Sequence, residues 1–287
     1  MRKFIRMIYR VVFDALWHFM EDDGWAMASH IALSTLLAVF PFIIFGTTMA
    51  AFLGADQFAP TVINIIFGSW PDLIKKPITD QVLQVLTIPR RGLLTASVLA
   101  AAYFASNGVE ALRISLNRAY RVTEIRPWYV TRLASLGYVV LSSFACIIIS
   151  FLLVAVPLAL GHSQRFFPAF YKLLRIIWNG RIYGSLLIIF IGLVFAHLFL
   201  PAGKRKIVSV LPGVLFTVVS WLFGAVFFTY YISTFSTYTA TYAGLASIMI
   251  VLVFLYMLGV IFIIGAELNA SLIKYNNICT GLISKNS

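Results

Sequence analysis

Long apolar stretches with few charges recur along the chain, separated by short polar or basic segments. A helix needs about 20 apolar residues to cross a bilayer core of roughly 30 Å. Six stretches reach that length, and we predict transmembrane helices at residues 29–54, 92–112, 132–160, 181–200, 207–232 and 244–272. Hydrocarbon offers no hydrogen bonds, so each span must satisfy its backbone internally as a helix. The sequence therefore predicts an all-α, polytopic membrane protein whose six spans form one domain over residues 29–272.

Four stretches outside the spans complete the domain plan. Residues 1–28 contain a stretch, 2–20, in which a charged or titratable residue recurs every four positions (Arg2, Arg6, Arg10, Asp14 and His18), while the apolar residues lie largely on other faces. This pattern predicts an amphipathic helix lying in the cytoplasmic membrane interface, and the alternative is a helix packed on the protein's own end. Residues 56–90 and 161–180 mix apolar and charged positions, which predicts helical segments on the periplasmic side. Residues 273–287 form a cytoplasmic tail.

Composition supports the membrane assignment and bears on the partner. Hydrophobic residues make up 61% of the chain and charged residues 11%, whereas soluble domains carry about a quarter charged residues. The net charge of +12 raises the alternative of a nucleic-acid partner. The basic residues, however, form short clusters beside the spans, as expected for contact with anionic lipid headgroups. We therefore predict membrane lipid, in particular anionic phospholipid, and no nucleic acid.

The distribution of positive charge sets the predicted orientation. With the N-terminus in the cytoplasm, most of the 22 Lys and Arg residues fall in cytoplasmic connections. Cytoplasmic loops of membrane proteins carry an excess of such residues. Both termini are therefore predicted to be cytoplasmic.

Glu110 and Glu267 are the acidic residues within the predicted spans, each near a cytoplasmic end. Ionisable groups in membrane helices are costly and are candidate functional residues. The residues predicted to share their level are Asn107, Asn269, His30 and Ser34. One hypothesis is a polar gate that accepts a headgroup or a proton. The alternative is a hydrogen-bond network that holds the helices together.

No motif in the sequence points to catalysis or to a cofactor. The four histidines have no metal-binding spacing, and neither a nucleophile elbow nor a phosphate-binding loop is present. His197, near the end of the fourth predicted span, is interpreted as a residue that reaches toward the membrane interface. The sequence therefore predicts a non-enzymatic protein with no metal site and no cofactor.

Four motifs support a resemblance across nearly the whole chain. They are Glu21-Asp22-Asp23 with Ala28-Ser29-His30, then Glu110-Ala111-Leu112 with Asn117-Arg118-Ala119-Tyr120, then Tyr242-Ala243-Gly244-Leu245-Ala246-Ser247, and finally Gly265-Ala266-Glu267-Leu268-Asn269-Ala270. With these motifs the sequence resembles the YihY/BrkB family of bacterial inner-membrane proteins. The resemblance implies six spans with cytoplasmic termini. Members have been labelled as a ribonuclease, a label regarded as mistaken, and as a virulence factor, and some are connected with lipid movement between envelope membranes.

The first hypothesis for function is lipid transport or export from the inner membrane, with envelope lipid-transfer proteins as partners. In it, Arg113 and Arg118 contact the lipid phosphate, and the polar gate admits the headgroup. The second hypothesis is a membrane scaffold that docks envelope proteins through residues 56–90 and 161–180. The remote alternative is a membrane-associated ribonuclease, for which basic loops supply phosphate affinity but no general base. The sequence does not predict an oligomeric state.

Overall fold

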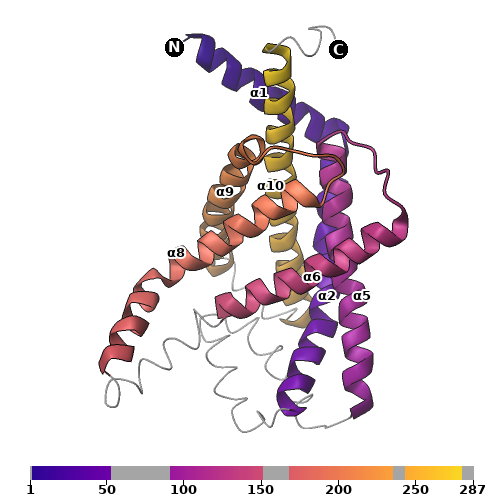
Figure 1. Cartoon of the computed structure of the whole chain (residues 1–287), viewed down its shortest axis with the longest axis vertical. Helices are drawn as coiled ribbons and strands as arrows, with labels where there is room; N and C mark the ends of the chain where they lie inside the picture. The colour runs from indigo at the N-terminus through magenta and orange to yellow at the C-terminus, as the bar shows by residue number, and fades with distance from the viewer. Residues whose placement is uncertain (1, 53–90, 151–167, 235–242, 280–287) are drawn as a thin grey trace. The chain divides into compact units, whose positions relative to one another are not determined.

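The computed structural model describes residues 2–52, 91–150, 168–234 and 243–279, and every regular element in this part of the chain is an α-helix (Figure 1). The helices are α1 (Arg2–Glu21), α2 (Gly24–Phe52), α5 (Arg91–Ala119), α6 (Trp128–Ser150), α8 (Pro168–Phe199), α9 (Ile207–Thr234) and α10 (Ala243–Cys279). The all-α prediction is confirmed for these residues.

Four helical stretches are long and apolar enough to cross a membrane, namely Trp128–Cys146, Gly180–Phe199, Ile207–Ile232 and Ile248–Asn277. They correspond to the last four predicted spans. The first two predicted spans lie on α2 and α5, which have 29 residues each. At a rise of 1.5 Å per residue, such helices are long enough to cross a bilayer, but the total of six spans stays a prediction.

The periplasmic segments predicted at 56–90 and 161–180 lie wholly and partly outside the described residues, respectively. The segment 56–90 is outside them, as is 161–167. The described remainder of 161–180 belongs to α8, which continues without interruption from Pro168 to Phe199 and so includes the fourth predicted span. Proline at the first position of this helix fits the preference for proline where no N–H is needed.

The chain forms two compact units, and the polar residues discussed below belong to the first. That unit comprises Met1–Ala38, Phe104–Ser135 and Leu193–Ser287, and the second comprises Val39–Tyr103 and Leu136–Gly192. In the first unit α10 packs against both α9 and α1 (Figure 1). Its centre is therefore the C-terminal helix, which also carries Glu267 and Asn269.

Small residues allow α9 and α10 to approach closely. A Cβ atom on Gly265 would lie 2.1 Å from Thr217 Oγ1, and a Cβ on Gly213 would lie 2.0 Å from the Gly265 carbonyl oxygen. Neither contact is sterically allowed, so only glycine fits at both positions. Close approach through small residues is a common way for membrane helices to pack. The close packing of α9 against α10 thus explains why glycine begins the Gly265-Ala266-Glu267 motif.

The predicted N-terminal segment 1–28 contains the helix α1, which ends at Glu21, and the start of α2 at Gly24, while its place in the cytoplasmic membrane interface stays a prediction. Val11, Ala15 and Phe19, spaced four residues apart, are buried, and α1 packs on α10. The other side exposes aromatic rings, with Tyr9 stacked on Phe13 and Phe13 on the next aromatic residue, Trp17. One face of α1 therefore packs on the protein, and another offers apolar surface.

Candidate functional site

The connection between α5 and α6, residues 120–127, carries many of the polar contacts between helices of the first unit. It begins with a Schellman motif, in which the Val122 N–H donates to the Asn117 carbonyl at 2.9 Å and the Arg121 N–H donates to the Arg118 carbonyl at 2.9 Å. Arg121 lies in the left-handed region, with φ 56°. This position usually favours glycine, so an arginine there indicates that its side chain is needed.

An ion-pair cluster joins the C-terminal half of α5 to this connection. Arg113 donates from Nε to Glu110 Oε2 at 3.0 Å and pairs with Glu124. Glu124 also accepts from Asn117 Nδ2 at 3.0 Å and from Arg126 Nε at 2.7 Å. The hydrogen bonds from Arg126 hold the pKa of Glu124 far below its ordinary value, and Asn117 contributes in the same direction. Glu124 is therefore a fixed negative charge shared by two arginines.

The start of α6 adds two further bonds to the cluster. Ser135 Oγ donates to Glu110 Oε2 at 3.0 Å, and Arg132 Nη1 donates to Asn107 Oδ1 at 2.8 Å. Two of the predicted gate residues, Glu110 and Asn107, are thus engaged by side chains of the following helix. Hydrogen-bonded charges of this kind restrict the geometry of the helices that carry them.

A second network is buried among α8, α9 and α10. Asn269 Nδ2 donates to Tyr120 Oη at 3.2 Å, and Tyr120 Oη lies 2.8 Å from His197 Nδ1. Tyr120 Oη accepts from Asn269, and the tautomer of His197 decides which group donates in the Tyr120–His197 hydrogen bond, while His197 Nε2 is buried without a partner among the described residues. Burial raises the pKa of Tyr120 to about 12, which keeps the hydroxyl protonated.

Asn269 also compensates for a proline in α9. Pro212 has no N–H and interrupts the helical hydrogen bonds. The Gly213 N–H donates to Asn269 Oδ1 at 2.7 Å, and Asn269 Nδ2 donates to the Val210 carbonyl at 2.9 Å. One amide side chain thus binds two backbone groups beside the proline and a hydroxyl of the α5–α6 connection.

Glu267 forms a third contact centre. Its side chain has no exposed surface, and its Oε2 accepts from Arg121 Nη2 at 3.0 Å, whereas Oε1 has no partner among the described residues. One turn further on, Ser271 Oγ donates to Asp14 Oδ2 at 2.7 Å, and Lys274 Nζ lies 3.5 Å from Asp14 Oδ1. Burial alone would raise the pKa of Asp14, but Ser271 and the neighbouring cations outweigh it and lower the pKa.

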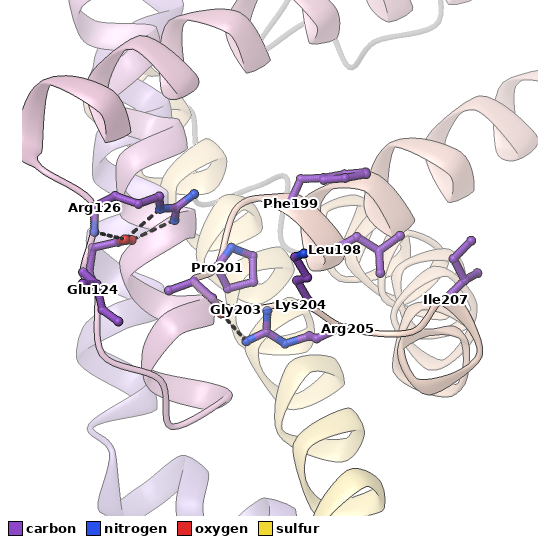
Figure 2. A pocket seen from close by; sticks show the side chains of 11 residues that line it. Glu124, Arg126, Leu198, Phe199, Pro201, Gly203, Lys204, Arg205 and Ile207 are labelled. Carbon is purple, nitrogen blue, oxygen red and sulfur yellow. Dashed lines mark hydrogen bonds and ion pairs between the residues drawn. The ribbon is translucent and has the colours of Figure 1, made fainter.

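A cavity of about 740 Å³ lies beside the turn between α8 and α9; Figure 2 shows its lining side chains. We call it the α8–α9 cavity; it is lined by Glu124, Ile125, Arg126, Leu198, Phe199, Pro201, Ala202, Gly203, Lys204, Arg205 and Ile207. Arg205 is held in place, since Nη2 donates to the Ala202 carbonyl at 3.0 Å and the guanidinium carbon lies 4.1 Å from the centre of the Tyr120 ring. Burial lowers the pKa of Arg205. The cavity thus combines cations with an apolar wall.

The structure places the predicted gate residues in separate networks. Glu110 is bound by Arg113, Glu267 by Arg121, and no described contact joins the two carboxylates. Ser34 is buried in α2, and its carbonyl oxygen lies 3.9 Å from where a Cβ on Gly108 would be. The remaining member, His30, is exposed and makes no described contact with either glutamate.

The predicted phosphate-binding arginines are both engaged by carboxylates. Arg113 is buried between Glu110 and Glu124, whereas the exposed Arg118 lies 3.4 Å from Asp23. Contact of either arginine with lipid phosphate stays a prediction. A lipid phosphate would have to compete with these carboxylates for the arginine side chain.

The interpretation of His197 as an interface residue is wrong. The side chain has no exposed surface and lies against Tyr120 and Phe262 rather than reaching outward. A histidine near the end of an apolar span has the same sequence pattern whether it reaches water or a tyrosine hydroxyl, so sequence could not separate these cases.

Sequence reasoning also did not single out Arg121, Glu124 and Arg205. The sequence signals that could have identified them are an acidic residue within a basic connection and the run Lys204-Arg205-Lys206 just before a span.

Chemically, the ion pairs neutralise most of the buried charge. Among the described residues no three His, Cys, Asp or Glu side chains gather as a metal site. The α8–α9 cavity offers binding chemistry, with cations and apolar surface side by side.

A family comparison covers nearly all of these residues. The profile of the family described as virulence factor BrkB matches residues 15–278. The chain belongs to the BrkB family. The predicted family resemblance is thereby confirmed. The matched region includes the ion-pair cluster of Arg113, the buried network of Asn269 and the α8–α9 cavity.

Three relatives are similar over most of this chain, and two of them are named membrane proteins. The chain is 30% identical over 253 residues to the putative ribonuclease-like protein YfkH of Bacillus subtilis, covering 88% of this chain and 91% of that protein. It is 24% identical to a UPF0761 membrane protein of Pseudoalteromonas translucida, covering 89% and 83% of the two chains. A UPF0761 membrane protein of Legionella pneumophila is 25% identical, with 91% of this chain and 61% of that one covered. No solved structure matches the chain.

Proposed function

We propose that this BrkB-family membrane protein binds phospholipid and takes part in lipid transport or export across the cell envelope, without catalysing a reaction. The single observation that carries the proposal is the α8–α9 cavity, in which cationic and apolar side chains face the same space. A phospholipid has the matching chemistry, a phosphate group joined to acyl chains.

The position of the cavity supports this ligand. Leu198 and Phe199 end the candidate span of α8, and Ile207 begins the candidate span of α9. Phe199 and Ile207 are exposed, so the apolar wall is open to a ligand. At the other edge Lys204 and Arg205 provide positive charge. A lipid leaving its leaflet would meet both kinds of surface at the end of two membrane helices.

We assign the protein to the inner membrane with both termini in the cytoplasm, following the excess of positive charge in the connections on that side. In this orientation the α8–α9 cavity faces the inner leaflet. Glu267, with one carboxylate oxygen lacking a described partner, is the strongest of the predicted gate residues. Asn269 and Glu110 would instead hold the helices in register, because their polar atoms are engaged.

The ribonuclease-like name belongs to the Bacillus relative. In this chain the carboxylate that lines the cavity, Glu124, is bound by Arg113, Arg126 and Asn117. A general base must be free to take a proton, so this glutamate is poorly suited to that role.

The test is lipid exchange between leaflets of vesicles that contain the full-length protein. Ile207→Trp fills the cavity mouth with an indole ring, and Val226→Trp makes the same kind of change on an exposed position of the same helix away from the cavity. We expect exchange of a fluorescent phospholipid above that of protein-free vesicles, slowed several-fold by Ile207→Trp and unchanged by Val226→Trp. Exchange no faster than in empty vesicles, together with no co-purified lipid, would refute the proposed function.

A further inference from the structure

A second cavity of about 680 Å³ lies on another side of the turn before α9. We call it the α9–α10 cavity; it lies between the start of α9 and the end of α10, with Met7 of α1 in its lining. Lys204, Arg205 and Lys206 all line it, and none of the described residues lining it is acidic. In the α8–α9 cavity, by contrast, Glu124 offsets part of the positive charge. The uncompensated charge is therefore concentrated in the α9–α10 cavity.

We infer that the α9–α10 cavity is a binding site for the phosphate group of an anionic phospholipid, contacted by Lys204, Arg205 and Lys206. The inference rests on the proposed function for the lipid nature of the ligand, and it adds the class of headgroup and the residues that recognise it.

Arg205 is positioned in advance for an anion. Tyr120 and the Ala202 carbonyl hold its guanidinium, while Nη1 is buried with no acceptor among the described residues. Nη1 has no surface that a water-sized probe can reach, so Arg205 contributes to the cavity the positive charge of a guanidinium fixed in place rather than a free donor.

The two lysines supply the remaining charge. Lys204 and Lys206 are exposed, and the structure records no carboxylate partner for either among the residues it describes. Ser209, the third residue of α9, also lines the cavity, and its hydroxyl donates to the Lys206 carbonyl at 2.6 Å. Three cations with no acid among them favour a headgroup that carries only negative charge, such as glycerol phosphate, over one that also carries a quaternary ammonium group.

Apolar lining residues favour lipid over free phosphate or RNA. Met7, Leu272 and Ile273 face the same space, and the last two lie on α10 within a candidate membrane span. A soluble anion gains nothing from these side chains, whereas an acyl chain or glycerol backbone removes them from water. The α9–α10 cavity also shares Lys204 and Arg205 with the α8–α9 cavity, so the same cations border both spaces.

The test is native mass spectrometry of the full-length protein with equal amounts of phosphatidylglycerol and phosphatidylcholine of identical chains. The lysine variant, Lys204→Gln with Lys206→Gln, removes two exposed cations, and the arginine variant, Lys204→Arg with Lys206→Arg, keeps both positive charges at the same positions. We expect the wild-type protein to retain phosphatidylglycerol preferentially. Its affinity should fall about 10- to 30-fold in the lysine variant and stay unchanged in the arginine variant.

Several results would overturn the inference: equal retention of both lipids, an unchanged preference in the lysine variant, or an equal loss in the arginine variant. Displacement of the lipid by millimolar inorganic phosphate would assign the site to free anions, and displacement by a short RNA would assign it to nucleic acid. If leaflet exchange persists without headgroup preference, this inference fails and the proposed function stands. If phosphatidylglycerol is retained selectively but no exchange occurs, the site stands and the transport function fails.

Discussion

Substitution of Arg121 is expected to destabilise the protein far more than substitution of its partner Glu267. The pair is asymmetric, since the carboxylate side chain has no exposed surface and the arginine side chain is 31% exposed. Arg121→Gln leaves a buried negative charge without its counter-ion, whereas Glu267→Gln leaves an arginine that can still reach water. Removing one partner of a buried pair costs about 3–5 kcal/mol when the charge left behind is buried.

We expect Arg121→Gln to lower the free energy of unfolding by about 3–5 kcal/mol and Glu267→Gln by less than about 1 kcal/mol. The glutamine at 121 keeps a side chain at the same positive φ, so backbone strain is matched to the wild-type protein. The double variant should resemble Glu267→Gln alone, because the uncompensated charge is then absent.

The assay is reversible unfolding in mixed micelles of dodecyl maltoside and increasing dodecyl sulfate, followed by tryptophan fluorescence. The reasoning would be refuted if both single variants lost the same stability, or if the double variant lost the sum of the two. Either result would mean that the carboxylate is solvated, takes up a proton, or is neutralised by another cation.

Two further predictions concern packing and pH. Gly265→Ala places a methyl group against Thr217 and should lower the free energy of unfolding by about 1–3 kcal/mol. At Gly137 an added methyl group would meet nothing within 4 Å, so Gly137→Ala should be neutral or slightly stabilising. Thermal unfolding of both variants tests this difference. The pKa of Glu124 is lowered by Arg126 from its ordinary value of 4.5, so its contribution to stability is present above that value and is lost as pH falls from there toward the lowered pKa. Unfolding measured from pH 7 to pH 3 should therefore show a steeper acid loss for the wild-type protein than for Glu124→Gln, and parallel curves would contradict it.

The residues of the last family motif each have a different structural role. In Gly265-Ala266-Glu267-Leu268-Asn269 the glycine permits the close approach of α9, the glutamate pairs with Arg121, and the asparagine binds the backbone beside Pro212. The sequence identified Glu267 and Asn269 as exceptional because polar groups in apolar helices are costly. It offered no means of choosing between a gate and a structural network, since that choice depends on which side chain lies opposite.

The apolar pattern by itself determined that the chain is helical and spans a membrane. Lipid forces each long apolar segment to satisfy its own backbone, so length and composition are sufficient. The same pattern predicted α1 as an amphipathic helix, because the spacing of its charges leaves only one way to arrange its faces.

Only the tertiary structure decided which polar groups meet. Glu110 and Glu267 were expected at a common level, yet each is bound by its own arginine, and His197 turned out to contact Tyr120, 77 positions earlier in the chain. The α9–α10 cavity likewise depends on the turn before α9 lying beside α10, and the α8–α9 cavity depends on the same turn lying beside the α5–α6 connection. Periodicity fixes the faces of one helix, but the rotation and partner of that face are set by close packing between segments far apart in sequence, which no local pattern encodes.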